Sequence, residues 1–147
     1  MILPLRLSVC ACVVATLSTV PAAAQQESDP FARARLDPGP RVTVGQPLRI
    51  TVEVLVPSYF TGGPRFPALD VRDALTVFED RGSNFTERVG RQTFAAQRRA
   101  FVVYPQRPGS YRIETIPVTV PYFDDTEGRT TATVSPPPIL CGRQPRS

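Results

Sequence analysis

The sequence contains no histidine, no lysine and no tryptophan, and it has only three cysteines in 147 residues. Without histidine there is no Ser-His-Asp or Cys-His nucleophile system, no imidazole metal ligand and no general base that ordinarily titrates near neutral pH. Most hydrolase and metalloenzyme mechanisms therefore lack their central residue. We expect a protein that is not an enzyme, and we assign it no catalytic residue, no metal ligand and no cofactor.

What the chain does contain is proline, arginine and apolar side chains. Seventeen prolines are roughly twice the usual share of ~5%. Hydrophobic residues nevertheless make up 41% of the chain and aromatic residues 8%, so the composition is not that of a disordered protein. Many prolines in an apolar chain indicate short strands joined by turns.

Residues 1–24 have the pattern of a secretory signal peptide. A short start carrying Arg6 precedes an apolar run over residues 7–20, which is shorter than the ~20 residues of a spanning helix. Small residues at 22–24 then precede Gln25, which predicts cleavage after Ala24. A lipoprotein signal ending at Cys10 is the alternative, but the apolar run continues well beyond that cysteine.

Cleavage would remove Cys10 and Cys12, so that the mature chain keeps Cys141 alone and forms no disulfide within the chain. Cys141 is then either a stray thiol in an irregular tail or a candidate for an intermolecular disulfide in an oxidising compartment. Loss of Arg6 leaves 16 arginines, spread along the chain, against 13 acidic residues. We therefore expect an exported protein with no nucleic-acid partner and no membrane span in the mature chain.

The mature chain divides into three parts. Residues 25–40 form an extended lead-in with little regular structure, residues 41–135 form one domain, and residues 136–147 form a Pro-rich linker and an irregular tail. Within the domain, the clearest signal is the period-2 alternation over 48–56, where every second residue is apolar. Further strands are expected at 41–44, 75–79, 84–88, 92–104, 111–120 and 130–134, with Gly90 at a hairpin turn and an edge or a bulge at Pro117.

The spacing of these strands predicts the fold class. No ten-residue stretch has helical periodicity with caps, and short strands recur every 8 to 12 residues or so. We predict an all-β protein, an antiparallel immunoglobulin-like β-sandwich of about seven strands preceded by the signal peptide. The Cys…Trp…Cys signature of antibody domains is missing, so the likeness is one of architecture.

One turn motif has a clear structural reason. Pro105, Gly109 and Tyr111 bring an aromatic residue next to a tight turn. The ring can enter the core there while the hydroxyl stays near the backbone.

Several ordered segments carry a family resemblance: residues 44–48, 54–57 with 59–62, 64–69, 84–88 and 104–111. Taken together, over about 40–138, the chain resembles the N-terminal immunoglobulin-like region of BatD proteins, the oxygen-tolerance (aerotolerance operon) proteins of Gram-negative bacteria. The resemblance implies a non-enzymatic periplasmic protein–protein interaction module linked to oxygen tolerance and envelope stress. Its implied partners are envelope proteins, in particular von Willebrand type A domain membrane proteins of the same operon.

Relatives of this kind continue into further modules and are usually anchored in the inner membrane. The resemblance therefore implies that this chain is a truncated form of a longer membrane-anchored protein. The alternative from another class is a ligand-binding β-sandwich, such as a carbohydrate-binding or adhesin-like module, which would need exposed, coplanar aromatic rings.

The candidate partner-binding residues are Tyr59, Phe60 and Phe66, within a loop rich in glycine and proline at 57–67. Aromatic residues on a rigid loop are good interface anchors. The alternative is that this loop folds over the open end of the sandwich and that the rings complete the core.

Two charged groups leave further alternatives open. Asp124, Asp125 and Glu127 could hold a calcium ion, but their spacing does not match the 12-residue helix-flanked calcium loop, and the alternative is a solvated hairpin turn before Gly128. Arg98 and Arg99 could hold an acidic partner or be solvated charges on a strand.

Overall fold

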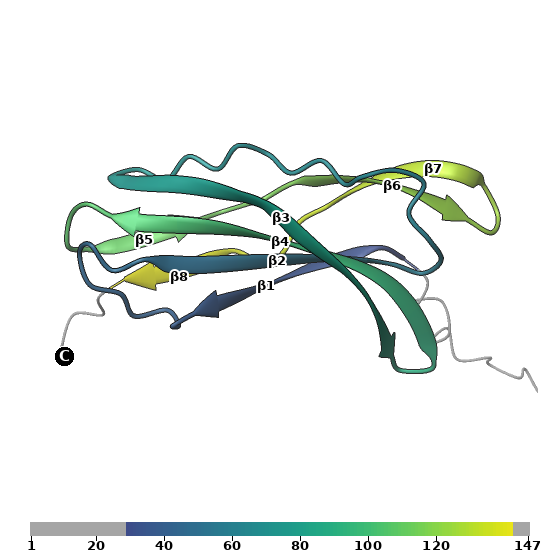
Figure 1. Ribbon diagram of the computed structural model, residues 1–147, viewed down its shortest axis with the longest axis horizontal. Coiled ribbons are helices and arrows are strands. Elements are labelled where there is room, and N and C mark those ends of the chain that lie inside the picture. Colours follow the sequence, from purple (N-terminus) through teal and green to yellow (C-terminus); the bar gives the residue numbers. More distant parts are fainter. Residues whose placement is uncertain (1–28, 143–147) are drawn as a thin grey trace, which may run out of the picture.

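The computed structural model describes residues 29–142, and every regular element in this part of the chain is a β-strand (Figure 1). The strands are β1 (Phe31–Asp37), β2 (Leu48–Val56), β3 (Ala74–Val89), β4 (Gln92–Pro105), β5 (Ser110–Ile113), β6 (Val118–Asp124), β7 (Gly128–Val134) and β8 (Ile139–Gly142). All strand pairings are antiparallel, which confirms the predicted all-β class. No helix among residues 29–142 is long and apolar enough to cross a membrane. The predicted signal peptide lies outside the described residues.

The first sheet has four strands in the order β1-β2-β4-β3. Its centre is β2, whose predicted alternation is confirmed: Leu48, Ile50, Val52, Val54 and Val56 are all completely buried. Their regular spacing puts all five on one face of the sheet. The register with β4 pairs this row with core residues such as Phe101 and Val103.

A second layer covers that face and consists of three pieces. β6 pairs with β7, β5 pairs with β8, and the segment 58–65 runs along the free edge of β6 through the bridges Phe60↔Tyr122 and Arg65↔Thr119. The prediction of a single strand over 111–120 is wrong, because β5 ends at Ile113 and β6 begins at Val118 in a different sheet. Pro117, expected at an edge or a bulge, lies in the interruption, where it has no N–H group to donate to a ladder. The break between β7 and β8 likewise contains three consecutive prolines.

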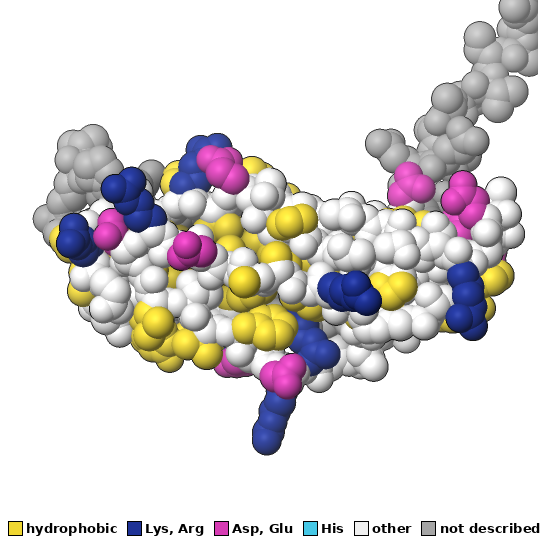
Figure 2. All heavy atoms as spheres, turned by 90° about the horizontal axis from the view of Figure 1, so that it is seen from above, with side chains coloured by type: hydrophobic (Ala, Val, Ile, Leu, Met, Phe, Trp, Pro, Cys, Tyr) yellow, Lys and Arg dark blue, Asp and Glu magenta, His cyan; other side chains and the backbone are white. Residues whose placement is uncertain are grey.

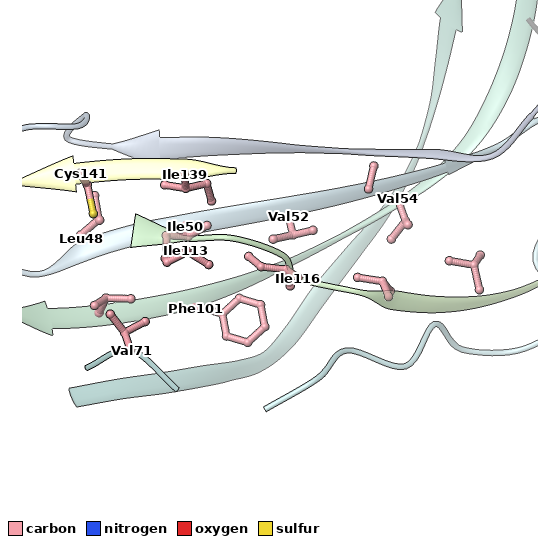
Figure 3. Close-up of a cluster of buried hydrophobic side chains, with 14 of the residues drawn as sticks. Leu48, Ile50, Val52, Val54, Val71, Phe101, Ile113, Ile116, Ile139 and Cys141 are labelled. Carbon is pink, nitrogen blue, oxygen red and sulfur yellow. The ribbon is translucent and has the colours of Figure 1, made fainter. Parts of the chain in front are cut away.

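The main core fills the space between these two layers. Figure 3 shows Ile50 and Val52 of β2 facing Ile113 of β5 and Ile116, with Phe101 of β4 beside them. All are among the least exposed side chains of the protein. Burial of branched aliphatic side chains on both layers supplies the main drive for folding, at roughly 25 cal/mol per Å² of apolar surface.

The structure corrects the expected start of the domain. β1 lies inside the segment 25–40 that was predicted to be an irregular lead-in, and residues 41–44 do not form the predicted strand. β1 pairs with β2 over its whole length, from Phe31↔Leu55 to Asp37↔Arg49. Its core-facing positions hold alanine at 32 and 34, and such small side chains make only a weak hydrophobic alternation.

The structure also corrects the expected end of the domain. Residues 139–142 were predicted to belong to an irregular tail, yet they form β8 and pair with β5. Ile139 and Cys141 are buried in the main core, while Leu140 between them is 62% exposed. Burial raises the pKa of the Cys141 thiol and shields its sulfur, so the folded protein does not offer this residue for an intermolecular disulfide.

β3 and β4 form one long hairpin. The predicted turn at Gly90 is confirmed, with a φ of 62° that suits glycine. The sequence predicted two separate strands at 75–79 and 84–88, but β3 is continuous and instead contains a bulge between Glu79 and Ser83. Figure 1 shows the far end of this hairpin curling away from the β6–β7 layer.

The turn before β5 has the geometry that its motif predicts. Tyr111 is buried in the main core, and its hydroxyl accepts the backbone N–H of Arg107 at 3.2 Å. The same hydroxyl donates to the carbonyl oxygen of Arg107, and the carbonyl oxygen of Asp73 lies within hydrogen-bond distance of it at 3.2 Å. One phenol oxygen therefore ties the β4–β5 turn to the residue that precedes β3.

Candidate functional site

The three aromatic residues of the 57–67 segment do not form one patch. Phe60 and Phe66 are half-buried and pack on the main core, whereas Tyr59 is 55% exposed. Tyr59 lies opposite Phe123 on β6, while residue 65 lies opposite residue 119, four positions away. That separation is about 13 Å along a strand. The packing of Phe60 and Phe66 agrees with the alternative in which the rings of this loop complete the core. Of the three aromatic residues, Tyr59 is therefore the one that a partner can reach.

Phe66 takes part in a second aromatic group that the sequence did not indicate. Its ring lies 6.0 Å from that of Phe78 on β3, which in turn lies 5.1 Å from that of Phe101 in the core. Figure 2 views the molecule from above Figure 1, on the side of the 57–73 segment, and hydrophobic side chains gather over the middle of this face. The group connects the 57–67 segment to β3 and to the core, while Phe78 itself remains 42% exposed.

The arrangement of Tyr59 does not favour a sugar-binding platform. Its ring is stacked on that of Phe123, with centroids 5.2 Å apart and planes inclined by 7°. The two rings therefore lie one over the other, so that each covers a face of its neighbour. A carbohydrate platform needs coplanar rings that are both exposed.

More charged and apolar side chains lie together on a different surface, the side of the four-stranded sheet that points away from the main core. We call this surface the open face. The strand register assigns to it Phe31, Arg33, Arg35, Asp37, Arg49, Thr51, Glu53, Leu55, Leu75, Val77, Glu79, Ser83, Phe85, Glu87, Phe94, Ala96, Arg98, Ala100, Val102 and Tyr104. Its positions alternate with those of the core along each strand. The open face has an apolar end, an arginine-rich middle and a second apolar end.

The first apolar end is a small second core beneath the curled end of the β3–β4 hairpin. Leu55, Phe94 and Ala96 are buried there, with Phe31 and Phe85 packed against them. The rings of Phe31 and Phe94 meet edge to face at 5.4 Å. This end of the open face is therefore occupied by the protein itself.

The arginine-rich middle is organised around Glu53, which is only 3% exposed. Arg33 donates from Nε to Glu53 Oε2 at 2.6 Å, and Arg98 Nη2 lies 3.5 Å from Oε1. The other side of the Arg33 guanidinium binds Glu87, and the guanidinium of Arg98 lies 4.3 Å above the ring of Phe85. The network joins all four strands. A buried carboxylate is costly unless it is paired, and Glu53 has two cationic partners.

Protonation equilibria in this network follow from the same contacts. The hydrogen bond from Arg33 lowers the pKa of Glu87, and the hydrogen bonds to Glu87 and then to Glu53 raise the pKa of Arg33. Arg33 therefore stays charged at every pH at which the protein is folded. The Glu87 carboxyl stays ionised further into the acid range than it does in the unfolded chain.

We expect Glu87→Gln to flatten the loss of stability on acidification. Because the folded state has the lower pKa, the pair stabilises the protein above the unfolded pKa of about 4.3, and this contribution is lost as the pH falls through the folded value. Urea unfolding measured from neutral pH down to about pH 3 tests this. Equal acid slopes for the variant and the wild-type protein would show that the ion pair is not formed.

A pocket of about 280 Å³ opens in the arginine-rich middle, beside the bulge of β3. Its lining consists of Arg49, Thr51, Arg81, Gly82, Ser83, Arg98, Arg99 and Ala100. At the bulge, residues 80–82 of β3 lie opposite the single residue Arg99 of β4. Such bulges redirect side chains out of the regular alternation of a strand.

Gly82 makes room for one of these arginines. A Cβ atom at this position would lie 2.5 Å from Nη1 of Arg99 and 2.7 Å from the carbonyl oxygen of Arg98. The Arg99 guanidinium instead donates to the carbonyl oxygen of Asp80 across the bulge. Arg98 and Arg99 are therefore both held in place, and neither is a simple solvated charge on a strand.

The acidic turn between β6 and β7 is organised by its own backbone. Asp124 Oδ1 accepts the N–H groups of Thr126 at 2.8 Å and Glu127 at 2.9 Å, and Gly128 follows with a φ of 79°. These contacts fit the hairpin-turn interpretation. Within residues 29–142 no three His, Cys, Asp or Glu side chains are grouped so as to hold a metal ion.

Comparisons with protein families, with curated proteins and with solved structures find no match to this chain. The resemblance to BatD proteins therefore stays a prediction.

Proposed function

We propose that this chain is a non-enzymatic protein–protein interaction module of the BatD type that acts among envelope proteins in the periplasm. One observation carries the proposal: the open face presents exposed apolar residues directly beside an ordered arginine cluster. Leu75 is 58% exposed and Val77 is 45% exposed, although both are strand residues. Aliphatic residues bordered by arginine are typical of binding surfaces.

The strand order supports an immunoglobulin-like architecture. The order β1-β2-β4-β3 corresponds to strands A, B, E and D of constant-type domains. The segment 58–65, β5 with β6, and β7 with β8 then correspond to strands C, F and G. The hydroxyl of Tyr111, bonded to backbone four residues upstream, is the counterpart of the tyrosine corner of such domains.

The proposed partners are the von Willebrand type A domain membrane proteins that the BatD resemblance implies. The link to oxygen tolerance and envelope stress comes from that resemblance alone. The open face adds the chemistry of the contact. A partner surface with aliphatic side chains next to acidic ones would match it.

Binding to such a von Willebrand type A domain tests the proposal. We expect Leu75→Asp to weaken the complex at least tenfold while the domain stays folded, because a charge replaces an exposed aliphatic contact worth about 1–2 kcal/mol. Calorimetric titration gives the affinity, and thermal unfolding reports the fold.

Leu140→Asp is the matched control, since Leu140 is equally exposed but lies on β8 in the other layer. Its complex should keep wild-type affinity. A complex that tolerates Leu75→Asp but is lost with Leu140→Asp would overturn the choice of surface. Failure of the wild-type protein to bind any such domain would overturn the proposed function.

A further inference from the structure

The geometry of the β3 bulge points to a binding site for carboxylates. We propose that the pocket beside the bulge binds two neighbouring carboxylate groups of an acidic peptide segment in the partner protein. The identity of that segment as part of a partner rests on the function proposed above. The recognition itself rests on the arginines of this chain.

Arginines from three strands line the pocket. Arg49 comes from β2, Arg98 and Arg99 come from β4, and Arg81 comes from the bulged residues of β3. The guanidinium group is a planar fork that matches a carboxylate with two parallel hydrogen bonds. The chain already makes one such pair here, since Arg49 binds Glu79 through two contacts of 2.7 and 2.6 Å.

The arginines that line the pocket are not all paired with carboxylates. Two of the four arginines have carboxylate partners, Arg49 with Glu79 and Arg98 with Glu53. Within residues 29–142 the ion pairs leave Arg81 and Arg99 without a carboxylate. Arg81 and Arg99 are therefore the two guanidinium groups with which the carboxylates of a ligand can pair.

The surroundings of the pocket favour a peptide over a phosphate group. The exposed Val77 lies two residues from Glu79 on the same face of β3, about 7 Å away. An acidic segment followed by an apolar side chain would therefore contact both the arginines and the apolar end of the open face.

The site is ordered before a ligand binds, because Gly82 leaves space for the Arg99 side chain and a hydrogen bond holds that side chain in place. The Arg99 guanidinium is fixed on the Asp80 carbonyl, and Arg98 is fixed between Glu53 and Phe85. Arginines that are already ordered lose less side-chain entropy when they bind. Arg81 is exposed and is the side chain that we expect to close on the ligand.

The test uses the purified protein and a synthetic hexaglutamate peptide, with hexaglutamine as the uncharged control. Arginine Nε–Hε signals in nuclear magnetic resonance spectra report which guanidinium groups respond. We expect hexaglutamate to shift the signals of Arg81 and Arg99, and binding to weaken severalfold as salt increases. Arg81→Gln should weaken binding about five- to tenfold, and Arg65→Gln, in the other layer, should leave it unchanged.

Arg99→Gln serves as a second variant with the same expected loss, so the proposal does not depend on one substitution. No shift with hexaglutamate, or equal losses for Arg81→Gln and Arg65→Gln, would overturn the site. Saturable binding of inorganic phosphate or of phosphatidylglycerol vesicles, with none of the peptide, would also overturn it and would assign the arginines to phosphate groups.

The outcome is separable from that of the proposed function. Peptide binding that depends on Arg81, without any complex with a von Willebrand type A domain, would support the site and overturn the proposed partner. A complex that depends on Leu75 but is indifferent to Arg81 and Arg99 would support the function and overturn the site.

Discussion

Ile139→Asp is expected to lower the free energy of unfolding by about 4–5 kcal/mol, most of the stability of a domain of this size. Ile139 is only 7% exposed and lies in the main core on β8, opposite Ile113 of β5. A carboxylate there has no cationic partner, and its burial costs far more than the lost apolar contacts alone. Unfolding in urea measures the change. Circular dichroism is a suitable signal, because the chain has no tryptophan for fluorescence.

Leu140→Asp is again the matched control, because Leu140 is the next residue of the same strand and faces solvent. It should change the free energy of unfolding by no more than about 1 kcal/mol. Equal effects of the two substitutions would mean that β8 does not pack into the core. The domain would then end before the three prolines, as the sequence alone predicts.

Phe60→Ala is expected to destabilise the protein by about 2–3 kcal/mol, somewhat less than the 3–5 kcal/mol of a fully buried phenylalanine. Phe60 packs on the main core and lies opposite Tyr122 on β6. Removal of the ring leaves a cavity. The segment 58–65 cannot move to fill it, because backbone hydrogen bonds hold this segment to β6. Thermal and urea unfolding both measure the loss.

Tyr59→Ala is the companion variant, since the neighbouring ring is mostly exposed. It should cost about 1 kcal/mol, the size of the lost stacking on Phe123. If Phe60→Ala kept the wild-type stability and Tyr59→Ala did not, Tyr59 would be the ring that packs on the core and Phe60 the exposed one. Loss of partner binding without loss of stability in Phe60→Ala would restore the interface interpretation.

Strong local signals made the centre of the fold predictable from sequence. The alternation of five apolar residues over β2 specifies both a strand and its buried face. Gly90 specifies a turn because its φ of 62° suits few other residues. Tyr111 after Pro105 and Gly109 specifies a buried ring near backbone. Each of these features depends on residues close together in the chain.

The first and last strands of the domain were not predicted, because their hydrophobic patterns in the sequence are short or weak. β1 presents alanines to the core, and β8 has four residues after three prolines, too few for a period to be seen. Both are strands because a partner strand supplies their hydrogen bonds and a core receives their side chains. The sequence alone contains neither the partner nor the core.

The candidate site depends even more on long-range geometry. Arg49, Arg81 and Arg98 are far apart in the sequence, and they meet only because β4 lies between β2 and β3. The bulge adds a local shift of register that places Arg81 beside them. Arg98 and Arg99 are recognisable in the sequence as an adjacent charged pair, but Glu53, the buried partner of Arg98, occupies an ordinary polar position of an alternating strand.

The central claim is that the open face is the surface through which this module binds its partner. The most direct measurement is methyl nuclear magnetic resonance of the protein titrated with a von Willebrand type A domain. We expect the methyl signals of Leu75 and Val77 to shift or broaden on binding while those of the equally exposed Leu140 remain unchanged. Shifts at Leu140 with none at Leu75 and Val77 would contradict the claim.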